Sequence, residues 1–138
     1  MRGRHLTSVA LVLGLSLSVP LGAEAQNTSA TASWQLTPAS ILKNSLRNVV
    51  AAQDKYRASH PTYAHSVEVL QVNSGADVKV QIMGVTATGW RAKATHKARP
   101  GRSCVVFVGP LRASELPKTD GDSEMAGEER VPLCDRME

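Results

Sequence analysis

The chain has 138 residues, carries a formal net charge of +4 and has a mean hydropathy of −0.17. This length supports one domain with one modest core and excludes two, and because only five residues are aromatic, that core must be mostly aliphatic. The two cysteines form no Cys-x-x-Cys pair, which excludes zinc-ribbon, thioredoxin-type and haem-attachment motifs.

The N-terminal segment has the pattern of a secretory signal peptide. A basic start precedes an apolar stretch over residues 6–21, and Ala23-Glu24-Ala25 is the small-x-small pattern that a signal peptidase accepts. We therefore expect residues 1–25 to be removed and the protein to be periplasmic or secreted. The alternative is an uncleaved membrane anchor, but the stretch is shorter than the roughly 20 residues of a spanning helix and contains Pro20. No later segment predicts a transmembrane anchor.

A flexible lead-in over residues 26–37, rich in Ser, Thr, Ala and Gln, precedes a helix. Thr37-Pro38 predicts the helix start, because Thr can cap free amides and Pro suits the first helical position. The helix should end before His60-Pro61, since the residue before Pro disfavours helical backbone. One helical face carries the large residues Leu42, Leu46, Val49, Gln53 and Tyr56, flanked by Ile41 and Val50.

Residues 65–70 predict a short helical turn, and three strand-like runs follow at 77–85, 89–97 and 103–109. Turn residues separate the runs, so we expect an antiparallel meander. One side of the middle run is small and apolar, which suits a helix lying across it, while its other side should carry Arg91, Lys93 and Lys97 to water.

A polar, acidic segment over residues 110–130 predicts a long loop before the chain returns at 131–134. Export would place Cys104 and Cys134 where disulfides persist, and a bond between them would tie the loop to the third strand, although two free thiols are the alternative. The predicted fold is α+β: one long N-terminal helix packed on a three- to four-stranded antiparallel sheet, with a disulfide-closed C-terminal loop, over residues 38–138.

Several short sequence segments, taken in chain order, resemble parts of the globular headgroup of type IV pilins and pseudopilins. LRNVVAAQDKY at residues 46–56 resembles the exposed half of the long pilin helix, HPTYA at 60–64 resembles the pilin turn, and GWRAKATH at 89–96 resembles the second sheet strand. Cys104 and Cys134 stand where such proteins place the disulfide that encloses their variable C-terminal loop. The likeness covers roughly residues 40–135.

This resemblance implies a pilin-like headgroup that is not an enzyme, needs no cofactor and acts as a structural or interaction protein. Its partners would be envelope proteins or components of a pilus or secretion assembly. An ordinary signal stands where pilins have a prepilin leader and an apolar helix, so we do not expect assembly into a filament by the usual route.

No residues predict a catalytic or metal site. Ser66 beside His65 lacks the Gly-x-Ser-x-Gly context of a serine nucleophile. Together with His60 and His96, His65 fits no known zinc spacing. The acidic loop at 118–129 has alternating carboxylates as a calcium loop does, but it lacks the Gly and Glu that an EF-hand requires. We expect a solvated loop there, with calcium binding as the alternative.

Charge is divided unevenly along the chain. Seven basic and no acidic residues lie at 79–112, whereas from 113 onward eight acidic residues face three basic ones. The two regions could complement each other within the fold. Alternatively, the protein could be a soluble binding module whose basic sheet face holds DNA or an acidic polymer through phosphate or sulfate contacts. The candidate residues for that face are Arg91, Lys93, Lys97, Arg99 and Arg102.

Overall fold

Helix α1 runs from Pro38 to Ser59 in the computed structural model, which describes residues 36–137. The Thr37 side chain caps it by accepting a hydrogen bond from the Ser40 amide at 3.2 Å, and His60 after it is extended. The predicted start and stop are both confirmed. The predicted signal peptide and nearly all of the predicted lead-in lie outside the described residues. In the described part, no helix is long and apolar enough to cross a membrane.

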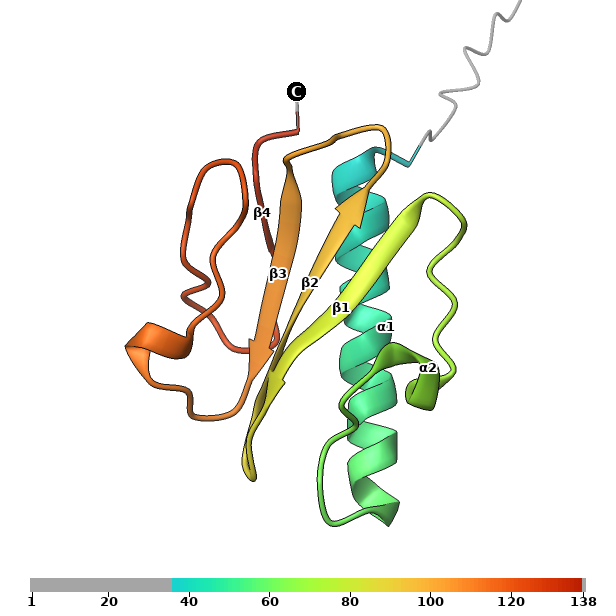
Figure 1. Ribbon diagram of the computed structural model, residues 1–138, viewed down its shortest axis with the longest axis vertical. Helices are drawn as coiled ribbons and strands as arrows, with labels where there is room; N and C mark the ends of the chain where they lie inside the picture. The colour runs from blue at the N-terminus through green and yellow to red at the C-terminus, as the bar shows by residue number, and fades with distance from the viewer. Residues whose placement is uncertain (1–35, 138) are drawn as a thin grey trace, which may run out of the picture. The chain divides into compact units, whose positions relative to one another are not determined.

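Four antiparallel strands form one sheet in the order β1-β2-β3-β4 (Figure 1). They are β1 (Val78–Val85), β2 (Trp90–His96), β3 (Ser103–Val108) and the short β4 (Leu133–Cys134). The three predicted runs are therefore confirmed as a meander. A fourth strand forms because the chain returns beside β3, where Cys134 pairs directly with Cys104. These two cysteines form a disulfide, as predicted.

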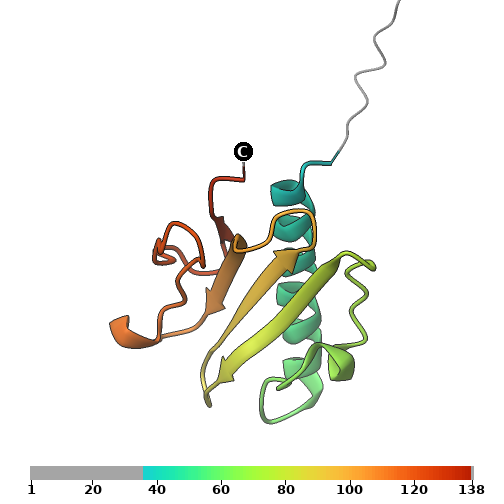
Figure 2. The same cartoon turned by 45° about the horizontal axis from the view of Figure 1, so that its top comes forward.

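The main core lies between α1 and one face of the sheet, with α1 behind the strands in Figure 2. Leu42, Leu46 and Val49 are fully buried against this face. The middle strand opposes them with Ala92 and Ala94, whose small side chains let the helix lie close. Each large aliphatic side chain buried here contributes roughly 1.5 to 3 kcal/mol to stability.

The connection from α1 to the sheet is held by a buried glutamine. Gln53 donates from Nε2 to the Ala64 carbonyl at 2.7 Å and accepts from the Ala64 amide at 2.9 Å, so both backbone groups of that turn are paired. The predicted short helical turn is confirmed as helix α2 (Val67–Leu70), and Val67 and Leu70 pack against the core.

Candidate functional site

The segment after β3 covers the sheet face opposite α1. Val105, Phe107 and Ala126 are buried there and form a second, smaller apolar cluster with Leu111, Leu116 and Leu133 around them. The segment contains a short 3₁₀ turn at Ala113–Glu115 (η1) and an isolated β-bridge between Lys118 and Met125. Every residue of β3 is consequently buried.

Asp135 anchors this segment from its C-terminal end. The residue is 3% exposed, and its carboxylate accepts hydrogen bonds from the amides of Ser103 at 2.7 Å, Gly121 at 2.9 Å and Asp122 at 2.6 Å. Burial raises the pKa of Asp135, but the Thr119 hydroxyl and these three amides outweigh burial and lower it to about 2. The carboxylate therefore stays ionised and joins strand β3 to the acidic loop.

Asp122 in the acidic loop binds back to the C-terminal end of the chain and to the residue just before β3. Its carboxylate accepts from the Arg136 amide at 2.7 Å and forms an ion pair with Arg102 at 2.7 Å. These two interactions, the Arg136 amide first, lower the pKa of Asp122. The expectation of a solvated acidic loop is wrong for this residue, whose side chain is 18% exposed, because its carboxylate is bound by Arg102 and the Arg136 amide.

Three of the five predicted anion-binding residues are engaged by the loop between β3 and β4. Arg91 donates to the Glu115 carbonyl, and Lys93 forms an ion pair with Asp120 at 3.0 Å. Arg102 forms the ion pair with Asp122 described above. Arg91 and Lys93 are therefore half-buried, where the sequence predicted exposure to water. The basic and acidic regions of the sequence do complement each other at these positions.

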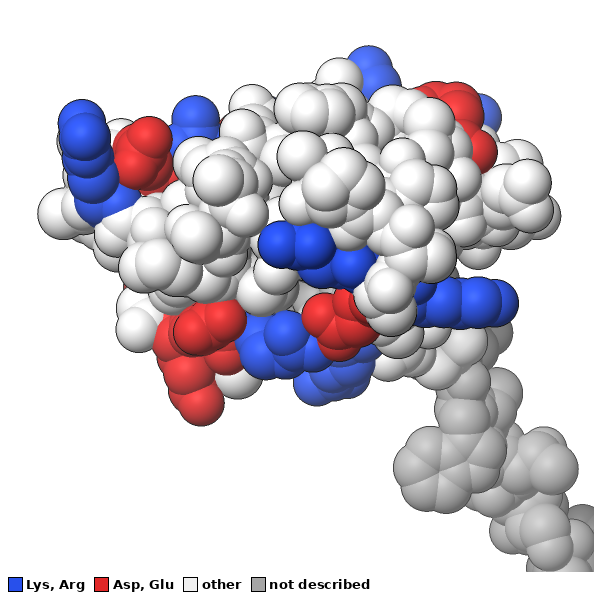
Figure 3. Space-filling model, turned by 90° about the horizontal axis from the view of Figure 1, so that it is seen from below, with Lys and Arg blue, Asp and Glu red and all other residues white. Residues whose placement is uncertain are grey.

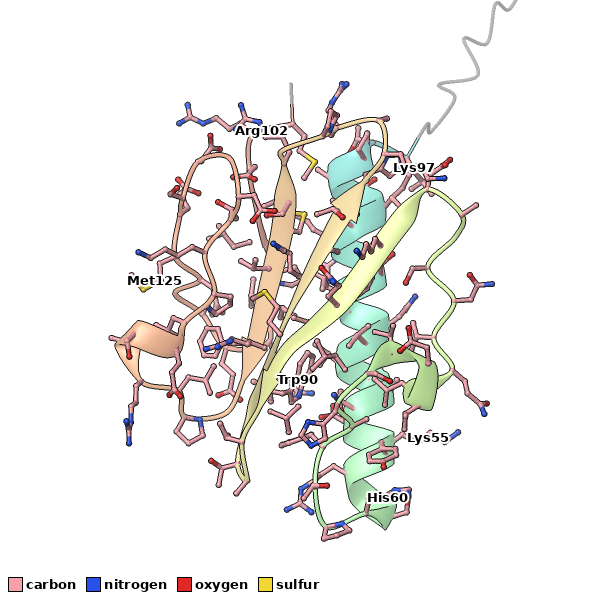
Figure 4. The ribbon with its side chains drawn as sticks, viewed as in Figure 1. Lys55, His60, Trp90, Lys97, Arg102 and Met125 are labelled. Carbon is pink, nitrogen blue, oxygen red and sulfur yellow. A yellow bond between two sulfur atoms is a disulfide. The ribbon has the colours of Figure 1, made fainter. Side chains whose placement is uncertain are left out.

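The other two predicted residues lie at the turn between β2 and β3. Lys97 faces Asp77 at 3.5 Å, and Arg99 donates from Nε to the Met137 carbonyl at 3.1 Å. Figure 4 shows Lys97 and Arg102 toward the same end of the sheet, with Met125 farther down the loop. Of the five predicted residues, Lys97 is therefore the exposed one, and the other four are partly buried.

The histidines are not brought together. The His60 ring stacks on Tyr56 with centroids 3.8 Å apart, whereas His96 lies at the end of β2, where its Nδ1 accepts from the Ala98 amide. Among residues 36–137, no group of three His, Cys, Asp or Glu side chains is placed to hold a metal ion. The acidic loop offers calcium no such group within that range.

A further ion pair ties the C-terminal segment to the helix. Arg130 binds Asp54 of α1, which raises the pKa of that guanidinium. Viewed from the end where α1 terminates, basic and acidic side chains are interspersed across the surface (Figure 3). Among the described residues, this view shows no continuous patch of one sign (Figure 3).

The contacts of Asp135 and Arg130 were not predicted from the sequence. A local signal for Asp135 is its position beside Cys134, because Cys134 pairs with Cys104, the neighbour of Ser103. Comparison with protein-family models and with curated proteins gives no match.

Proposed function

We propose that this protein is exported and acts, without catalysis, as an interaction protein of the type IV pilin headgroup kind in the cell envelope or outside it. The observation that carries the proposal is the order of parts. Helix α1, the short α2, the antiparallel meander and a C-terminal segment closed by Cys104–Cys134 follow one another as the pilin resemblance implies.

The disulfide also supports export. It joins two cysteines that pair directly across β3 and β4 and that are 30 positions apart in the sequence. Such bonds form and persist in oxidising compartments and are rare in the cytosol. The predicted signal at residues 1–25 would deliver the chain to such a compartment.

The disulfide-closed segment is the surface that we assign to partner binding. Met125 and Val131 are 44% and 43% exposed there, although both are apolar. The Asp135 carboxylate and the disulfide hold this segment in place, so little conformational entropy is lost when a partner binds. The partner we propose is a pilus or secretion-system protein in the same envelope.

Site-specific photocrosslinking tests this assignment. A photoreactive amino acid replaces Met125 on the loop or, as control, Lys55 on the exposed side of α1 (Figure 4). Crosslinking in the native envelope is followed by purification at low and high salt. We expect pilus or secretion-system components on the Met125 probe at both salts and none on the Lys55 probe. Equal labelling by both probes, or recovery of nucleic acid or acidic polymer at low salt only, would contradict the proposal.

A further inference from the structure

A hollow of about 400 Å³ lies where β1 begins and β2 ends, and the β2–β3 turn closes one side of it. Its lining comes from three separate segments, residues 76–79, 95–97 and 99–101. A hollow of this size accommodates a small ligand rather than a macromolecular surface. It lies away from the loop residues assigned to partner binding.

Positive charge dominates the lining. The lining contains three cationic side chains, Lys79, Lys97 and Arg99, and one carboxylate, that of Asp77. Lys79 takes part in none of the ion pairs formed within residues 36–137. The pair between Lys97 and Asp77 spans 3.5 Å with side chains 74% and 63% exposed, and such exposed pairs contribute little. Arg99 is half-buried and donates from Nε to the Met137 carbonyl, so Lys79 and Lys97 are the two exposed cations of this lining.

Two uncharged donors add to this set. The His96 Nδ1 accepts from the Ala98 amide at 3.1 Å, so the neutral ring carries its proton on Nε2 and can donate from there. Gly101 has a φ of 73°, and its amide makes no hydrogen bond within the described residues. The His96 ring and the Gly101 amide therefore add hydrogen-bond donors beside the three cations.

We propose that this hollow binds the phosphate or sulfate group of a small ligand. Lys79, Lys97 and Arg99 would supply charge, and the Gly101 amide would supply a directed hydrogen bond to an anion oxygen. Val78 and Pro100 in the lining offer apolar contact to the ligand's carbon skeleton. This inference does not depend on the proposed pilin-type function, because it uses a different surface.

Titration of the ¹⁵N-labelled protein, with the disulfide intact, tests the site at low ionic strength. The probes are inorganic phosphate, inorganic sulfate and a hexose 6-phosphate, and amide chemical shifts report the location and the affinity. We expect saturable shifts centred on Gly101 and the end of β2. Lys79→Ala should weaken binding at least fivefold, and Asp77→Asn should strengthen it.

Lys55→Ala is the matched control, because it removes the same charge from the exposed side of α1, outside this hollow. It should change the affinity less than twofold. Equal weakening by Lys79→Ala and Lys55→Ala would overturn the proposal, since it would show general charge attraction. Shifts spread over the lysines and arginines of α1 would overturn it as well.

Discussion

Asp135 binds both backbone groups of Ser103, using its main chain for one and its side chain for the other. The Asp135 amide donates to the Ser103 carbonyl at 3.0 Å, and the Asp135 carboxylate accepts from the Ser103 amide at 2.7 Å. The disulfide between Cys104 and Cys134 is adjacent to both residues. A covalent bond and an ionised carboxylate therefore fix the same point of the chain.

Stability should fall in acid because of Asp135. Its pKa drops from the usual 3.8 to about 2 on folding, so its contribution is complete above pH 4 and is lost as the pH falls through about 2. A shift of this size corresponds to about 2 kcal/mol. Urea denaturation from pH 7 to pH 2 measures the loss, and Asp135→Asn should flatten this part of the profile while lowering stability at pH 7.

The control for that variant is Asp54→Asn. Its ion pair with Arg130 is nearly half exposed, so we expect its removal to cost less than about 1 kcal/mol. If the two variants lost equal stability at pH 7, the Asp135 carboxylate would not be the anchor described here.

Replacing both cysteines by alanine should lower the free energy of unfolding by about 3 to 4 kcal/mol, as the closed chain segment of 30 residues implies in the chain-entropy model. Hydrogen exchange should accelerate most at the amides of Gly121 and Asp122, which Asp135 holds beside the disulfide. Faster exchange in α1 with no change in the loop would contradict this account.

The elements of this fold could be predicted from the sequence because their signals are local. Thr37 and Pro61 mark the helix ends, and the alternation in residues 77–97 marks two strands. The order and antiparallel direction of the strands followed from short turns. These predictions depended only on residues that are close to one another in the sequence.

The arrangement of the loop could not be predicted, because its contacts are between residues far apart in the sequence. Asp135 reaches Ser103 across 32 residues, and Lys93 reaches Asp120 across 27. Composition indicated that a basic and an acidic region could complement each other, but not which side chains would pair. The hollow beside Lys97 was missed for the same reason, since three segments contribute to it.

Leu46→Asp should unfold the domain, because Leu46 is fully buried between α1 and the sheet and the new carboxylate would have no partner. Asn48→Asp, on the exposed side of the same helix, should change stability by less than about 0.5 kcal/mol. Circular dichroism during thermal unfolding distinguishes the two. A folded, protease-resistant Leu46→Asp protein would show that this helix face is misplaced.

Gln53→Leu should cost about 2 to 4 kcal/mol, although it replaces a polar residue in the core by an apolar one of similar size. The reason is that the amide and carbonyl of Ala64 would both be left without partners in a buried turn. Chemical denaturation measures the loss, and Lys55→Leu on the exposed side of α1 is the control. Stabilisation by Gln53→Leu would show that water replaces the lost hydrogen bonds.

The central claim is that this protein is exported and closed by a disulfide. Its most direct test is the intact mass of the protein purified from the periplasm and from the medium of the cells that produce it. We predict a chain that begins at Gln26, with a mass two hydrogens below that of the reduced form. A chain that keeps residues 1–25, or cysteines that alkylate without prior reduction, would contradict the claim.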